Sequence, residues 1–166
     1  AKLLGNLHLQ DRGLGYDAFG CERESVLLTY YAFRLLYKYY FRVESQGIEN
    51  IPSEGRALLV SNHSGLLPFD ASMISVDTMS QMARPRMVRS IVDFSPFALP
   101  YINIFFRRAG QVPGTRRNFA ELLEQEQLVL VFPEGARGTT KPFSERYRLR
   151  RFNLGFVELA LQKRTP

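Results

Sequence analysis

Three short apolar runs, separated by segments with helical spacing, constrain the fold more than any other feature of the chain. The runs are RALLVSN (56–62), RMVRSIV (86–92) and LVLVF (128–132). Runs of this length, rich in aliphatic and β-branched residues, are typical of buried strands. Strands that alternate with helices favour a layered α/β domain, in which helices flank a sheet with several parallel strands. We therefore predict that fold class.

Helices are expected between and around these runs. The predicted helices are 22–41, 68–80, 114–127 and 152–162. Thr115 is the expected N-cap of the third. Further strands are predicted at 42–48 and through IFFRR (104–108), after an aromatic stretch that begins at Phe94. The sequence is thereby divided into an N-terminal arm with an aromatic and basic helix (1–41) and an α/β domain (42–166).

The amphipathic segment 22–41 has two interpretations. Apolar and aromatic residues cover most of its circumference, which is too apolar for a free surface helix and too charged to span a bilayer. In the first interpretation the helix packs on the core and its basic groups reach solvent. In the second it lies in a membrane interface, with Arg34, Lys38 and Arg42 facing lipid phosphates. Both interpretations remain open.

Charge and composition narrow the class of partner. The net charge is +6, and the chain has 13 Phe and 8 Tyr but no Trp. This suits an anionic partner with an apolar part, such as a phospholipid surface or an acyl thioester, and it also suits nucleic acid. No recognisable nucleic-acid-binding motif is present, so we expect no nucleic-acid partner. Cys21 is the only cysteine, and His8 and His63 are far apart, so we expect no disulfide and no metal site.

A polar stretch, NHSGLLPFD (62–70), follows the first of the three runs. The neutral imidazole of His63 can accept a proton at cellular pH, and a carboxylate on its other ring nitrogen would fix the tautomer. Asp70 is the candidate carboxylate. Pro68 favours a helix start, however, so Asp70 is equally a helix cap or a partner of the helix dipole. Spacing alone does not separate the catalytic interpretation from the structural one.

No protein nucleophile accompanies this pair in the sequence. Ser64 is not in the G-x-S-x-G setting of a nucleophile elbow, and Cys21 is remote. A His–Asp pair without a nucleophile suits direct activation of a substrate hydroxyl. The pattern therefore favours acyl transfer to an alcohol over a covalent acyl-enzyme. The sequence does not identify the oxyanion donors, for which the backbone N–H groups near Ser64 and Gly65 are candidates.

A second polar stretch, FPEGARG (132–138), follows the run LVLVF. Arg137 is suited to bind a phosphate bidentately, and Glu134 to accept a bond from a substrate hydroxyl. The alternative is a strand-end turn in which Glu134 pairs with a neighbouring Arg. Ligands collect at the carboxyl ends of parallel strands, so His63 and Glu134 are expected at the same rim. We interpret the basic run ERYRLRR (145–151) as a solvated face.

The ordered series LLVSNHSG with a following Asp, then INIFFRR, then LVLVFPEGARG resembles the glycerolipid acyltransferase family, typified by 1-acyl-glycerol-3-phosphate acyltransferase. The resemblance spans roughly 42–166. It implies that His63 and Asp70 deprotonate a glycerol hydroxyl, which attacks the thioester of acyl-CoA or acyl carrier protein without a further cofactor. The acceptor, a lysophosphatidate-like lipid or glycerol phosphate, would be bound by the matching residues Arg108, Glu134, Gly135 and Arg137.

Three departures from the family pattern are visible. Six residues, SGLLPF, separate His63 from Asp70 where the family has H-x4-D, an arrangement similar to a divergent bacterial branch with HSGxxPxD. Ile102 stands where the second block usually opens with glycine, and Arg107 replaces an acidic residue. The family usually continues into another strand with a Val-Pro block, so we expect the domain to be incomplete at its C-terminal end.

The leading hypothesis is a membrane-associated O-acyltransferase, peripheral on the cytoplasmic face and in contact with an anionic lipid surface. Two alternatives stay open. One is a non-catalytic basic module that binds anionic lipid or nucleic acid, and the other is an inactive homologue of the acyltransferases.

Overall fold

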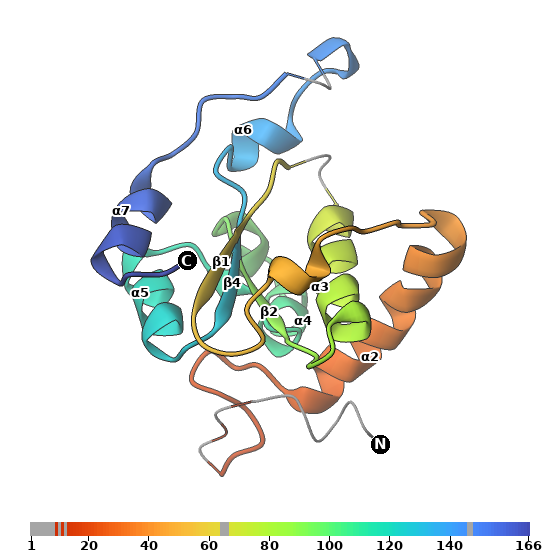
Figure 1. The fold of residues 1–166 in the computed structure, drawn as a ribbon, viewed down its shortest axis with the longest axis vertical. Coiled ribbons are helices and arrows are strands. Elements are labelled where there is room, and N and C mark those ends of the chain that lie inside the picture. Colours follow the sequence, from red (N-terminus) through yellow and green to blue (C-terminus); the bar gives the residue numbers. More distant parts are fainter. Residues whose placement is uncertain (1–8, 10, 12, 64–66, 146–147) are drawn as a thin grey trace.

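A parallel sheet forms the centre of the molecule. The computed structural model describes residues 9, 11, 13–63, 67–145 and 148–166. Its sheet has four strands in the order β1-β4-β2-β3, all paired in parallel (Figure 1). The strands are β1 (Ala57–Val60), β2 (Val88–Val92), β3 (Val112–Pro113) and β4 (Leu128–Val131). The predicted α/β fold is therefore confirmed, and the three apolar runs form β1, β2 and β4.

The central strand β4 shows how the sheet is covered on both faces. Its four residues are all buried, and successive side chains point to opposite faces. Val129 and Val131 pack with residues of α5 (Arg116–Glu124) and α7 (Gly155–Gln162). Leu128 and Leu130 pack against α3 (Phe69–Gln81). Figure 1 shows α5 and α7 on one side of the sheet and α3 on the other.

The N-terminal helix packs on the core with one face only. It comprises α2 (Arg23–Leu35) and a π-helical turn, η1 (Leu36–Tyr40). Tyr30 and Tyr37 are buried beside α3, and the Tyr37 hydroxyl donates to Asp77 Oδ1 at 2.6 Å. The other face leaves large apolar and aromatic side chains exposed, namely Leu28, Tyr31, Leu35, Tyr39 and Tyr40. Among the described residues, no helix has the length and apolar character needed to cross a membrane.

The segment before α2 is tied to the sheet by a buried ion pair. Asp17 Oδ2 accepts from Arg89 Nη1 at 2.5 Å, and both side chains are buried. Asp17 Oδ1 accepts from the backbone N–H groups of Phe19 and Cys21. Burial raises the pKa of the Cys21 thiol to about 12. Cys21 is therefore a protonated core residue rather than a reactive thiol.

Two of the predicted strands are wrong. Residues 42–47 form no strand, because Gly47 has φ 78 and Ser45 donates its hydroxyl to Asp77 on α3, and η2 (Ile48–Asn50) follows. Residues 104–108 belong to α4 (Ile102–Arg108), which follows η3 (Ser95–Ala98). Aromatic and β-branched residues in 102–106 have high strand propensity, but their backbone groups bond locally, as from Phe105 N to Tyr101 O.

The segment between β4 and α7 differs from the prediction in its last part. It contains the short helix α6 (Ala136–Thr139) and the turn η4 (Phe143–Glu145). The predicted helix 152–162 begins only at Gly155, because Asn153 donates its backbone N–H to Pro133 O at 2.9 Å. In Figure 1 the segment passes over the end of the molecule at which β1 and β4 end.

Candidate active site

His63 and Asp70 meet at the carboxyl edge of the sheet. His63 follows β1, and Asp70 lies in the first turn of α3. His63 Nδ1 and Asp70 Oδ2 are 2.6 Å apart, and the two side chains are only 18% and 15% exposed. Asp70 Oδ1 accepts the backbone N–H of Ala71 at 2.8 Å. Six intervening residues therefore still allow the carboxylate to reach the imidazole.

The surroundings of the imidazole fix its orientation. The hydrogen bond to Asp70 favours the neutral tautomer with the proton on Nδ1, which leaves the lone pair on Nε2. The ring also stacks on Phe132, with a centroid distance of 4.3 Å and an interplanar angle of 20°. Among the described residues, Nε2 has no hydrogen-bond partner. His63 thus presents a basic nitrogen that the protein itself does not occupy.

The loop after β4 packs directly against His63. A Cβ atom at Gly138 would lie 2.9 Å from Glu134 Cβ and 3.3 Å from His63 Cβ, which only glycine avoids. Gly135 has φ 57 and ψ −153, a conformation that is essentially restricted to glycine. His63 and Glu134 are therefore neighbours at one rim, as expected from the parallel strands.

Glu134 is buried and engaged with its own loop. Its Oε2 accepts from Lys141 Nζ at 2.8 Å and from the backbone N–H of Arg150 at 2.8 Å. Burial raises the pKa of this carboxyl, but the bonds from Lys141 and Arg150, helped by the nearby backbone N–H of His63, outweigh it and hold the pKa below its ordinary value. The expected Arg partner is thus replaced by Lys141. Oε1 bonds to no described residue and is buried as well.

Arg137 and Gly135 line an open pocket beside this rim. The pocket has a volume of about 430 Å³, and Pro133, Ala136, Arg151, Phe152 and Asn153 are among its walls. It adjoins a second recess of about 390 Å³, whose walls come from β2, β4, α5 and α7 and include Phe132. The Arg137 side chain is exposed and makes no ion pair or hydrogen bond with the described part of the chain.

The structure does not bring Arg108 to this site. Arg108 Nε lies 3.7 Å from Glu22 Oε2, and its carbonyl accepts the Glu22 N–H. A Cβ atom at Gly110 would lie 3.7 Å from the sulfur of Met87, which directly precedes β2. Arg108 therefore lies toward the amino edge of the parallel sheet. Strands of this length separate the two edges by roughly 10 Å or more.

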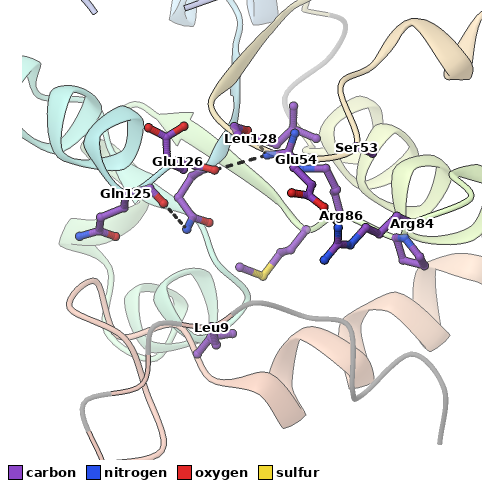
Figure 2. A pocket seen from close by; sticks show the side chains of 12 residues that line it. Leu9, Ser53, Glu54, Arg84, Arg86, Gln125, Glu126 and Leu128 are labelled. Carbon is purple, nitrogen blue, oxygen red and sulfur yellow. Dashed lines mark hydrogen bonds and ion pairs between the residues drawn. The ribbon is translucent and has the colours of Figure 1, made fainter.

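A different pocket, of about 420 Å³, occupies the amino edge (Figure 2). It is lined mainly by polar and charged side chains that include Glu54, Arg84, Arg86, Gln125 and Glu126. Among the residues that the structure describes, no group of three or more His, Cys, Asp or Glu side chains is arranged to hold a metal ion.

Lys141 and Phe132 are site residues that sequence reasoning did not single out. Lys141 is one of many basic residues in a polar loop, and nothing in its spacing marks it as the partner of Glu134. Phe132 was expected only as the end of a strand. The oxyanion donors expected near Ser64 and Gly65 lie outside the described residues.

Comparisons with known proteins give one family model and several relatives. Residues 42–166 match the family model described as Acyltransferase. The chain is 42% identical to the uncharacterized protein Rv0502 of Mycobacterium tuberculosis over 134 residues, which are 80% of this chain and 37% of that protein. It is 43% identical to the uncharacterized protein ML2427 of Mycobacterium leprae over 129 residues, 77% of this chain and 35% of that protein.

A more distant relative carries a functional name. The chain is 27% identical over 124 residues to a Bos taurus protein named DGAT1/2-independent enzyme synthesizing storage lipids, with 74% of this chain and 36% of that protein covered. The chain thus spans little more than a third of these relatives. No solved structure shows significant similarity. Because the family model covers most of the chain, the chain belongs to the acyltransferase family.

Proposed function

We propose that the protein transfers a fatty acyl group from an acyl thioester to the hydroxyl of a phosphate-bearing acceptor, either a lysophosphatidate-like lipid or glycerol phosphate. His63 acts as general base and Asp70 orients it. The observation that carries this proposal is the 2.6 Å bond between His63 Nδ1 and Asp70 Oδ2, with Nε2 left to a substrate.

The reaction needs no nucleophile from the protein. His63 Nε2 takes the proton of the acceptor hydroxyl as the oxygen attacks the thioester carbonyl carbon. The C–S bond then breaks, the thiolate takes the proton from the imidazolium, and the products are an ester and a free thiol. Asp70 stabilises the imidazolium while it exists. The donor is acyl-CoA or acyl carrier protein, and no cofactor takes part.

Arg137 binds the acceptor phosphate in this proposal. Its guanidinium is exposed at the pocket beside Glu134 and has no partner in the described chain. Gly135 forms the pocket wall without a side chain, which lets the acceptor approach the backbone. Glu134 contributes by holding the loop through Lys141 and Arg150.

A peripheral position on the cytoplasmic membrane face follows from the same proposal. The exposed aromatic residues Tyr39 and Tyr40, 67% and 72% exposed, lie next to Lys38 and Arg42. Aromatic rings flanked by basic side chains suit the interface of an anionic bilayer. The family and the name of the bovine relative support a lipid acceptor.

The test is acyl transfer measured as thiol release from acyl-CoA, with lysophosphatidate and glycerol 3-phosphate as acceptors. His63→Ala is expected to lower turnover by about 10²- to 10⁴-fold, the usual contribution of a positioned base. Arg84→Gln is the matched control, because Arg84 is half-exposed and pairs with Glu54 at the amino edge. Near-normal turnover by a folded His63→Ala variant would contradict the mechanism. If wild type and both variants all release no thiol, the result would instead favour a lipid-binding module.

A further inference from the structure

A second arginine faces the pocket that contains Arg137. Arg151 belongs to the basic run 145–151, which the sequence suggests is a solvated face, yet it lines the same pocket of about 430 Å³. Like Arg137, it is exposed and makes no ion pair or hydrogen bond with the described residues. Two arginines from separate segments thus line one pocket, and neither side chain has a partner among the described residues.

The position of Arg151 is set by backbone bonds on either side of it. Arg150 donates its N–H to Glu134 Oε2 at 2.8 Å, and Asn153 donates its N–H to Pro133 O at 2.9 Å. These bonds tie the segment around Arg151 to the loop that carries Arg137. Arg151 therefore belongs to a fixed wall of the pocket, not to a free surface strand.

The charge of this pocket is not neutralised from within. Its one carboxylate, Glu134, is buried and already paired with Lys141. Glu145, the nearest acidic residue along the chain, is paired with the Arg150 side chain. Two guanidinium groups that have no partner in the described chain and line one pocket favour a dianion, because each can donate two parallel hydrogen bonds to phosphate oxygens.

The neighbouring recess indicates what such a dianion is attached to. It shares Pro133, Gly135 and Asn153 with the arginine pocket, and its remaining walls include Ile91, Phe119, Phe156 and Leu159. Phe132, which stacks on His63, lines the same recess. A ligand with its phosphate at the arginines would place its less polar part beside the ring that supports the base.

We infer that Arg137 and Arg151 together bind the phosphate group of a substrate of the proposed acyl transfer, with Arg151 as a specificity-determining residue. This inference rests on the proposed function. The phosphate has two possible sources, the acceptor headgroup and the nucleotide part of acyl-CoA, and the experiment separates them.

The experiment compares wild type, Arg151→Gln and Arg148→Gln. Arg148 lies in the same basic run, is exposed and does not line the pocket, so it controls for the change in charge. KM is measured for lysophosphatidate against a neutral monoacylglycerol, and for acyl-CoA against acyl-pantetheine. Loss of one charge-assisted bond predicts a rise in KM of at least about tenfold for the phosphate-bearing member of one pair. The substrate pair whose KM ratio changes identifies the source of the phosphate group.

A binding measurement separates this inference from the proposed function. Calorimetric titration with short-chain lysophosphatidate, and separately with CoA, needs no turnover. Weaker binding of one of them by Arg151→Gln alone supports the inference even if wild type shows no acyl transfer. Unchanged binding and KM in Arg151→Gln, or an equal effect of Arg148→Gln, overturns it while leaving the role of His63 intact.

Discussion

The two edges of the sheet have charged pockets of similar volume, but the arginine side chains are paired at one edge and without described partners at the other. At the amino edge Arg84 pairs with Glu54, and Arg86 donates to the carbonyl oxygens of Pro52 and Gly55. At the carboxyl edge Arg137 and Arg151 have no such partners in the described chain. His63 Nε2 likewise has no hydrogen-bond partner among the described residues.

This difference separates charges that hold loops together from charges that remain available to a ligand. A guanidinium whose donors already bond to backbone carbonyls offers little further binding energy to a substrate. A guanidinium at a concave rim beside an oriented imidazole still has its donors free to bind a substrate. Pocket volume alone does not locate the reacting site, whereas the unsatisfied donors and acceptors do.

The largest expected effect comes from the buried pair that supports the carboxyl edge. Glu134→Ala leaves the Lys141 ammonium buried without its partner, and breaking such a pair costs about 3–5 kcal/mol of unfolding free energy. Glu145→Ala is the matched control, because its pair with Arg150 is partly exposed and contributes about 0–1 kcal/mol. Urea denaturation measures both. Similar losses in the two variants would contradict a supporting role for Glu134.

The same pair predicts a dependence of stability on pH. The pKa of Glu134 in the folded protein lies below its ordinary value of 4.5. Its stabilisation is therefore complete above that value and is lost as the pH falls through the lower folded-state pKa. Glu134→Gln should reduce the loss of stability on acidification below pH 4.5. An acid denaturation curve identical to that of wild type would contradict the bonding of the Glu134 carboxylate to Lys141 and Arg150.

The smallest effect is expected at Arg108, although the family resemblance assigns it to acceptor binding. Arg108→Gln should leave the KM for the acceptor close to that of wild type, because its side chain lies with Glu22 toward the amino edge. Arg137→Gln should raise that KM by about tenfold or more. Steady-state kinetics on both variants measure the contrast. A larger rise for Arg108→Gln would mean that acceptor binding involves a different arrangement of α4.

Sequence patterns predicted the layers of the fold and the pairing of His63 with the right carboxylate. The strands β1 and β4 are short apolar runs, and β2 is a short run rich in β-branched residues that also contains Arg89 and Ser90. The carboxyl ends of parallel strands meet at a shared edge. The strand expected at 104–108 failed because aromatic and β-branched residues favour strands only in a suitable packing context, and here their backbone closes a helix.

The remaining site residues could not be read from local patterns. Lys141, Arg150 and Arg151 reach the rim only because the segment after α6 folds back over the loop at Glu134. Such contacts depend on the path of an irregular loop, which carries no periodic signal. The family resemblance assigns Arg108 to acceptor binding because of its place in a motif. A motif fixes the order of residues, but it does not fix the edge of the sheet at which a side chain lies.

In the proposed mechanism Asp70 makes His63 a base by holding the proton on Nδ1. Asp70→Asn tests it most directly, because an amide that donates to Nδ1 would favour the tautomer protonated on Nε2 and leave no basic nitrogen for the substrate. We expect kcat for thiol release to fall by about 10²- to 10⁴-fold, with the acceptor KM little changed and Cys21 still inaccessible to thiol reagents. A folded Asp70→Asn variant with near-normal kcat would contradict it.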